Sequence, residues 1–158
     1  MPKYLLDTSI LLHYVRGSAI AEYIDVKYYP SELPNYSVVS VVSLGEIYSL
    51  SYSLKWGLTK QEILKRLLNS IPAVDINHSA IINSFAEIDS YRQGKHPTKS
   101  LPEGESAKAI GDNDLWIAST AIILKAKLLT LDKDFLLFKG IFLDVIYIDQ
   151  EQFKNSSS

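Results

Sequence analysis

Cysteine is absent from this sequence of 158 residues. Disulfide bonds and thiolate metal sites are therefore excluded, and the reducing cytoplasm is the compartment that we expect. The sequence also lacks any apolar run close to the roughly 18 residues that a membrane-spanning helix needs. Its opening residues, "MPKYLLD", do not follow the pattern of a signal peptide. We therefore expect a cytoplasmic protein that is not inserted in a membrane.

A strong charge of either sign is missing as well. The sequence has 16 basic and 18 acidic residues, and its net charge is −2. A nucleic-acid ligand would therefore need a local basic patch or bound metal ions. The segment "SLGEI" lacks the lysine and the second glycine of a phosphate-binding loop. The three histidines, His13, His78 and His96, are scattered and have no nucleophile motif near them, which argues against a hydrolytic triad.

Strand-like and helix-like segments alternate along the chain, and 47% of the residues are hydrophobic, which is enough for one sizeable core. This alternation predicts an α/β fold with a short parallel sheet of about four to five strands and helices on both faces. We expect a single domain over residues 1–150 and a disordered tail over residues 151–158. The expected strands are 4–6, 37–40, 73–76, 127–131 and 143–148. Helices are expected between them, with Ser43, Thr59 and Asp112 as N-terminal caps.

Acidic side chains follow the expected strands. Asp7 follows the first strand, Asp132 follows the fourth, and Glu46 lies in the first turn of the helix after the second. Asp112 and Asp114 open a later helix, in the segment "GDNDLWIAS". Because sites in parallel sheets form outside the carboxyl ends of the strands, these acids are expected to meet at one edge.

Clustered carboxylates need protons or cations between them. Two unit charges about 4 Å apart repel by roughly 4 kcal/mol at an effective dielectric constant of 20. Oxygen ligands without cysteine favour Mg²⁺ or Mn²⁺ over zinc. Such ions activate water and stabilise the leaving oxygen in a displacement at phosphorus. The acids therefore predict metal-assisted cleavage of a phosphodiester.

Each acid also has a purely structural interpretation. Asp7 and Asp112 are residues that cap helices well. Glu46 and Asp114 would offset the helix dipole in a first turn. The same interpretation applies to the acids at the last short helix, which are Asp132 and Asp134.

Three segments of the sequence resemble motifs of a known family: "YLLDTSILLHYVRG", "SVVSLGEIYS" and "IGDNDLWIASTAIILKAKLLTLDKDF". Together they resemble the PIN-domain family of metal-dependent ribonucleases, and especially the VapC-type toxins of prokaryotic toxin–antitoxin modules. The first segment is similar to the family's first strand and acid, and the second to its glutamate motif. The third is similar to the third and fourth motifs, so the likeness runs from Tyr4 to Ile148.

The resemblance implies a set of site residues. Asp7, Glu46 and Asp114 correspond to the three main metal-binding acids of the family. Asp132 corresponds to a fourth, variable position, with Asp134 as the alternative register. The polar residues that would support these acids are Thr8, Ser9, Asp112 and Thr130.

The resemblance also implies an activity and partners. It implies an endoribonuclease that uses Mg²⁺ or Mn²⁺ and cuts single-stranded or loop RNA to leave a 5′-phosphate. It further implies a homodimer and a cognate antitoxin protein with a segment that lies over the active site.

A long connection, Gln93–Ala109, departs from a compact member of that family. The densest basic stretch of the chain, which lies at its start, is Arg92, Lys95, His96 and Lys99. These side chains are candidates for contacts with RNA phosphates, and the alternative is a solvated loop. Tyr48 and Tyr52, four residues apart on one expected helix, fit either a protein interface or core packing.

Two other functions remain open from the sequence. One is a Mg²⁺-dependent phosphatase with Asp7 as the nucleophile, although "DTSIL" lacks the second aspartate two residues on that aspartate phosphatases carry. The other is a non-catalytic binding module with the same fold but without metals.

Overall fold

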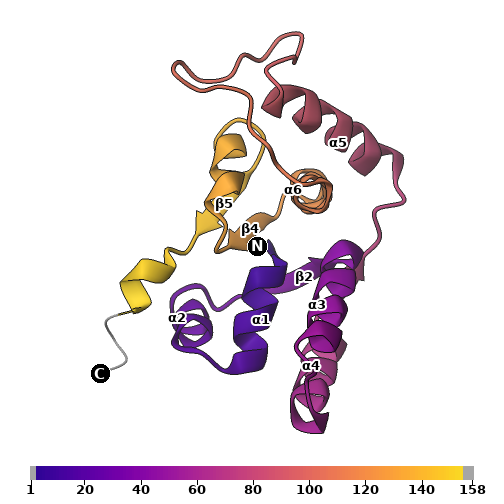
Figure 1. The fold of residues 1–158 in the computed structure, drawn as a ribbon, viewed down its shortest axis with the longest axis vertical. Coiled ribbons are helices and arrows are strands. Elements are labelled where there is room, and N and C mark those ends of the chain that lie inside the picture. Colours follow the sequence, from indigo (N-terminus) through magenta and orange to yellow (C-terminus); the bar gives the residue numbers. More distant parts are fainter. Residues whose placement is uncertain (1–2, 155–158) are drawn as a thin grey trace.

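Five parallel strands lie side by side at the centre of the structure, a computed structural model that describes residues 3–154. The strands lie in the order β3-β2-β1-β4-β5. They are β1 Lys3–Leu6, β2 Tyr36–Ser40, β3 Ala73–Val74, β4 Lys127–Thr130 and β5 Asp144–Tyr147. The predicted α/β fold with a short parallel sheet is therefore confirmed (Figure 1).

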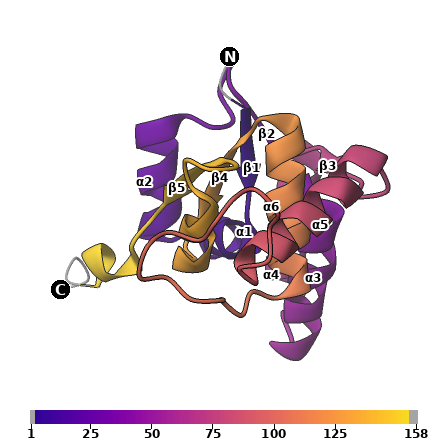
Figure 2. The ribbon, with the colours of Figure 1, turned by 90° about the horizontal axis from the view of Figure 1, so that it is seen from above.

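Helices cover both faces of this sheet, as Figures 1 and 2 show. The helices are α1 Thr8–Arg16, α2 Ala19–Tyr28, α3 Val41–Ser53, α4 Leu58–Ser70, α5 Ser79–Arg92 and α6 Asp112–Leu124. Two short 3₁₀ helices, η1 Lys133–Phe138 and η2 Gln150–Phe153, flank β5. Within residues 3–154, no helix has the length and apolar character that crossing a membrane requires.

The alternation of side chains along the strands divides the core into two layers. Tyr4 and Leu6 of β1 belong to one layer with residues of α1, α2, α3 and α4. Leu5, between them, belongs to the other layer with residues of α5, α6 and η1. Burying each large apolar side chain contributes about 1.5–3 kcal/mol, so both helix layers are held firmly to the sheet.

The expected helix caps are wrong at three positions, because each of these helices starts earlier than the local sequence suggests. Helix α3 begins after Ser40, whose side chain accepts a hydrogen bond from the backbone N–H of Val42 at 3.1 Å. Ser43 is instead buried inside the helix. Glycines occupy the other two cap positions: Gly57 precedes α4 and Gly111 precedes α6, in place of Thr59 and Asp112.

The expected tail from residue 151 begins with ordered structure. Residues 151–153 belong to η2, and the Phe153 ring lies 5.3 Å from the Tyr23 ring of α2 in an edge-to-face contact. This aromatic contact explains why the chain remains attached to the domain beyond β5. Residues 155–158 lie outside the described part of the chain.

The long connection between α5 and α6 is an irregular loop tied to the domain at both ends. The Lys108 N–H donates to the Arg92 carbonyl at 3.0 Å, and the Arg92 guanidinium donates to the Lys108 carbonyl at 3.2 Å. Leu101, in the middle of the loop, packs against the core layer under α5 and α6. Figures 1 and 2 show the loop reaching from α5 towards η1.

Candidate active site

The direction in which the strands are added reverses between β1 and β4. From β1 the chain proceeds to β2 and β3 on one side, whereas β4 and β5 lie on the other. In open α/β sheets, binding sites form at such a reversal, outside the carboxyl ends of the strands. Asp7 is the residue that directly follows β1, and Thr130 is the last residue of β4. The fold therefore brings these two residues to the position where a site is expected.

Asp7 is buried and is held by three hydrogen-bond donors. One carboxylate oxygen accepts from the Thr8 backbone N–H at 2.7 Å, which makes Asp7 the N-terminal cap of α1. The other accepts from the Ser9 hydroxyl at 3.0 Å and from the Thr130 hydroxyl at 2.7 Å. Asp7 is thus both the helix cap and the predicted site residue, and donors from α1 and β4 fix its orientation.

Burial raises the pKa of Asp7, although the hydrogen bonds from Thr130, Ser9 and Thr8 oppose this shift. The charge of Glu46 raises it further. A carboxylate that is only 5% exposed and lies near a second carboxylate is costly for the fold unless a proton or a cation balances its charge.

The hydroxyls around Asp7 also bind the backbone of the segment after β4. The Thr130 hydroxyl accepts from the Asp132 N–H at 2.9 Å, and the Ser9 hydroxyl accepts from the Leu131 N–H at 3.2 Å. Ser9 and Thr130 therefore connect the end of β1 to the end of β4. Both are among the supporting residues that the family resemblance implies.

Glu46 lies in the second turn of α3 rather than the first, because the helix starts at Val41. Two polar side chains orient it. The Thr8 hydroxyl donates to one carboxylate oxygen at 2.7 Å, and the Asn113 amide donates to the other at 3.4 Å. Asn113 belongs to the quoted "GDND" segment, but nothing in the sequence singles it out, because its partner is 67 residues away.

Asp114 gives the clearest sign that the acids form a cluster. Burial and, after it, the charges of four other acids together raise its pKa to about 7. In order of decreasing effect these acids are Asp7, Asp132, Glu46 and Asp134. Residues from the beginning, middle and end of the chain therefore share one electrostatic environment.

Asp132 and Asp134 have structural partners as well. Asp132 caps η1 by accepting from the Asp134 N–H at 2.9 Å. Asp134 forms an ion pair at 3.5 Å with Lys108, which comes from the end of the long loop. Asp112, the first residue of α6, is exposed and is not among the acids that act on Asp114.

The donors of this cluster fit a hard divalent cation in their chemistry, because the acids supply only oxygen. Within residues 3–154, however, no three His, Asp or Glu side chains are gathered closely enough to hold a metal by themselves. Mg²⁺ retains several waters and is commonly bound by one or two carboxylates together with substrate phosphates. Burial and then the charges of four nearby acids raise the pKa of Asp114, and a cation between the acids would offset that repulsion.

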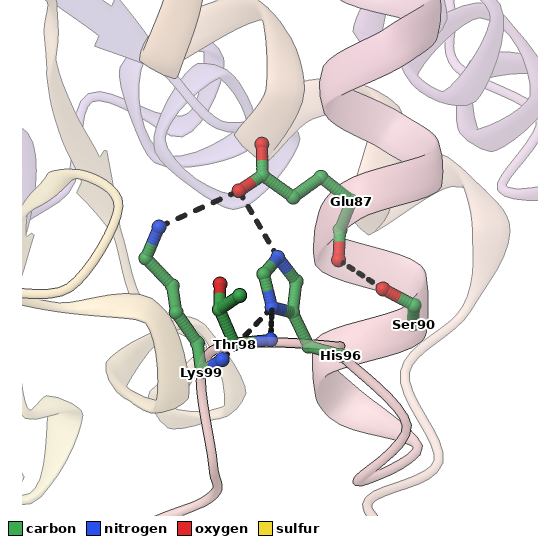
Figure 3. Close-up of polar contacts among 5 residues, drawn as sticks. All are labelled: Glu87, Ser90, His96, Thr98 and Lys99. Carbon is green, nitrogen blue, oxygen red and sulfur yellow. Dashed lines mark hydrogen bonds and ion pairs between the residues drawn. The ribbon is translucent and has the colours of Figure 1, made fainter.

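The predicted RNA-binding residues are mostly engaged within the protein. Figure 3 shows His96 and Lys99 directed at Glu87 of α5, at 3.2 and 3.6 Å. The other ring nitrogen of His96 accepts from the backbone N–H groups of Thr98 and Lys99. These contacts fasten the first part of the long loop to α5.

Arg92 and Lys95 complete that basic stretch. Arg92 lies 2.7 Å from an Asp89 carboxylate oxygen, a charge pair without hydrogen-bond geometry, while Lys95 is exposed. The sequence shows the positive charges, but it does not show that α5 supplies acids to match them.

Tyr48 and Tyr52 lie on the surface, which excludes core packing as their role. They are 49% and 84% exposed and line a hollow of about 1080 Å³ between α3 and α4. None of the predicted site acids lines this hollow. A smaller hollow, of about 590 Å³, lies beside Glu46, so the larger of these two hollows is not the one next to the predicted site acids.

A comparison with protein families gives one match. The model of the PIN domain family matches residues 4–140. This range contains every acid of the cluster as well as Ser9 and Thr130. No curated protein matches the chain.

Several solved structures share the fold at low sequence identity. VapBC2 from Rickettsia felis, bound to a DNA fragment, matches with a TM-score of 0.69 and 22% identity, over 93% of this chain and 99% of that chain. VapBC-1 from nontypeable Haemophilus influenzae matches with a TM-score of 0.64 and 22% identity, over 92% and 97%. VapBC-5 from Mycobacterium tuberculosis, described as a member of the VapBC family of toxin–antitoxin systems, matches with a TM-score of 0.62 and 18% identity, over 94% and 100%. At these identities the matches establish the fold alone.

Proposed function

Because this chain belongs to the PIN-domain family, we propose that it is a divalent-metal-dependent endoribonuclease and the toxin of a toxin–antitoxin pair, acting in the cytoplasm. The observation that carries the proposal is the hydrogen bonding that brings the acids together: Thr8 donates to both Asp7 and Glu46, and Thr130 donates to Asp7 and accepts from the Asp132 N–H. The raised pKa of Asp114, to which burial and four other acids contribute, agrees with it. An anionic cluster of this kind, at the reversal point of a parallel sheet, suits a cation that meets a phosphate.

Asp7, Glu46 and Asp114 are the residues that would hold Mg²⁺ or Mn²⁺, with Asp132 as a fourth ligand. When bound, the metal supplies an activated water and offsets the charge on the leaving oxygen. The protein's own contribution is orientation: Asp7 is fixed by Thr8, Ser9 and Thr130. Such supporting hydrogen bonds typically change metal affinity or activity by 10–100-fold.

Glu46 and Asp114 are positioned less tightly than Asp7. Glu46 has one hydrogen bond at 2.7 Å from Thr8 and a longer one at 3.4 Å from Asn113. Asp114 lies in the first turn of α6, where the helix dipole favours a negative charge. These two acids can therefore adjust to a metal, while Asp7 provides the fixed point.

The phosphatase alternative fits the surroundings of Asp7 poorly. Aspartate phosphatases carry a second aspartate two residues after the nucleophile, but here that residue is Ser9, whose hydroxyl donates to the Asp7 carboxylate at 3.0 Å. The non-catalytic module remains the alternative that the metal titration below addresses.

An antitoxin partner and a homodimer are part of the proposal. Structures that share the fold are described as toxin–antitoxin systems, and the α3–α4 surface exposes Tyr48, Tyr52 and Leu58. Exposed aromatic groups are enriched in protein interfaces. A small neighbouring reading frame that encodes a DNA-binding protein would support the antitoxin part of the proposal.

RNA cleavage is expected to require a divalent metal. Purified protein incubated with single-stranded RNA and Mn²⁺ or Mg²⁺ should produce fragments with 5′-phosphates, and a chelator should stop the reaction. Gel analysis and end-group labelling measure both results. Ca²⁺ serves as the control for charge without the same preferred geometry. RNA binding without cleavage, together with no Mn²⁺ binding by calorimetry at millimolar metal, would instead identify a non-catalytic module.

A further inference from the structure

A second hollow, of about 590 Å³, lies directly beside Glu46. Helix α3 forms one side of it, and Thr8 of α1 and Asn113 of α6 form the other. Besides Glu46, the residues of α3 that line it are Val41, Val42, Gly45, Ser49 and Leu50. Since Thr8, Glu46 and Asn113 belong to the acid site, this hollow continues that site along α3.

The lining residues of α3 form two adjacent rows on one helix face. Their spacing of four residues places each nearly one turn above the last. One row consists of Val41, Gly45 and Ser49, and the other of Val42, Glu46 and Leu50. At 1.5 Å per residue, each row extends for about 12 Å from its first residue to its last. The hollow is therefore a short groove with Glu46 midway along one wall.

Gly45 leaves the centre of this groove open. An added Cβ at Gly45 would meet no atom within 4 Å, and the residue does not have the positive φ that favours glycine. Neither packing nor backbone conformation therefore requires glycine there. Glycine in a helix interior is also less stable than alanine. What glycine provides at this position is open space above α3.

The composition of the groove argues against an anionic occupant. None of the described residues that line it is Lys or Arg, so it offers nothing to neutralise a phosphate. Val41, Val42 and Leu50 supply aliphatic walls, while Ser49 and Asn113 supply groups that both donate and accept hydrogen bonds. Apolar walls with a few polar groups, in a volume of about 300–1,000 Å³, are typical of small-molecule sites.

We propose that this groove is a nucleobase subsite, and that Gly45 is the residue that determines its specificity. The base of the unpaired nucleotide next to the scissile phosphate would lie over Gly45, between the aliphatic walls. Ser49 and Asn113 would read the edge of that base. This inference rests on the proposed ribonuclease function, because the groove acquires its substrate from the neighbouring acids.

Substitutions that fill the groove test the subsite without changing any residue of the acid cluster. Gly45→Leu is expected to lower kcat/KM for single-stranded RNA by about tenfold or more, mainly through KM, and to change the bases that flank the cut sites. Gly45→Ala, which adds one methyl group, should have a smaller effect in the same direction. Ser53→Leu is the matched control, since Ser53 is an exposed residue near the end of α3 that does not line the groove.

Two further readouts show that the variants remain intact. The rise in Tm that Mn²⁺ produces should be the same in Gly45→Leu as in the wild type, because Glu46 is unchanged. The metal-free Tm should rise by about 2–4 °C, since a better helix former replaces glycine and its Cβ meets no atom within 4 Å. A less stable Gly45→Leu protein, or one with a smaller metal response, would overturn the proposal.

The cleavage pattern on a random RNA pool decides the remaining outcomes. Wild-type cut sites and rates in Gly45→Leu would overturn the subsite while leaving the ribonuclease function intact, and the groove would then be free for a protein segment. A uniform loss with unchanged base preference would assign the groove to the RNA backbone and also overturn the proposal. Wild-type protein that cleaves no RNA would overturn both.

Discussion

Asp7→Asn is expected to reduce RNA cleavage by roughly a thousandfold, equivalent to about 4 kcal/mol of transition-state stabilisation. The substitution retains the shape of the side chain but removes the negative charge nearest the reversal point of the sheet. It also replaces one acceptor oxygen with an amide that donates, in a pocket where Thr8, Ser9 and Thr130 all donate. The rate is measured with saturating Mn²⁺ on single-stranded RNA.

Two control variants show whether the loss of cleavage in Asp7→Asn is specific to this position. Asp144→Asn makes the same change at an exposed position where β5 begins, at the opposite edge of the sheet, and should cleave RNA like the wild type. Ser9→Ala removes one donor to Asp7 and should cost only about 10–100-fold. Undiminished cleavage by Asp7→Asn would count decisively against the assignment.

Asp114→Asn is expected to stabilise the metal-free protein while abolishing its response to Mn²⁺. The pKa of Asp114 is raised to about 7 from an ordinary value of 3.8, first by burial and then by the other acids. The folded protein therefore holds this proton more tightly than the unfolded chain does. The protonated Asp114 therefore stabilises the folded state below about pH 4, and this contribution is lost as the pH rises from about 4 to about 7. Above pH 7, Asp114 causes no further change in stability.

Thermal denaturation at pH 8 and pH 5 measures this effect. Without metal at pH 8, removing the charge should contribute on the order of 1 kcal/mol after solvent screening, or about 2–4 °C in Tm. At pH 5, where the wild-type carboxyl is largely protonated, the melting temperatures of the two proteins should differ less. With Mn²⁺ the wild type should melt at the higher temperature, because only the wild type gains a ligand that binds the folded state. A metal-free Asp114→Asn protein that melts below the wild type at pH 8 would contradict the account.

The positions of the acids are predictable because they depend on strand ends. Short apolar runs such as 4–6 and 127–131 identify buried strands, and parallel strands place their carboxyl ends together. Asp7 and Asp132 can therefore be assigned to one edge of the sheet from the amino-acid sequence alone. The hydrogen bond that links these strand ends, from the Thr130 hydroxyl to Asp7, joins residues 123 apart in sequence. The two core layers follow in the same way from the alternation of side chains along β1.

The helix starts are less predictable, because several residues near each start are good caps. Ser40 and Ser43 are both suitable cap residues, and the end of β2 decides in favour of Ser40. Gly111 precedes α6 in the same way, so Asp112 lies inside the helix. Local preference narrows such a boundary to a few residues, and strand pairing selects among them.

Contacts between distant segments are the hardest to predict. The basic stretch at Arg92–Lys99 is visible in the sequence, but its pairing with Glu87 depends on how the loop folds back on α5. The pairs Asn113–Glu46 and Lys108–Asp134 are equally non-local. No periodicity or motif marks these residues, since each interaction exists only once the layers have assembled.

The central claim is that residues from the beginning, middle and end of the chain form one cation site. Crystals grown with Mn²⁺ and measured by anomalous scattering test it most directly. The account predicts a manganese peak in contact with carboxylate oxygens of both Asp7 and Asp114, with Glu46 beside it. Manganese bound only elsewhere on the protein, or separately to these two carboxylates at distant positions, would contradict it.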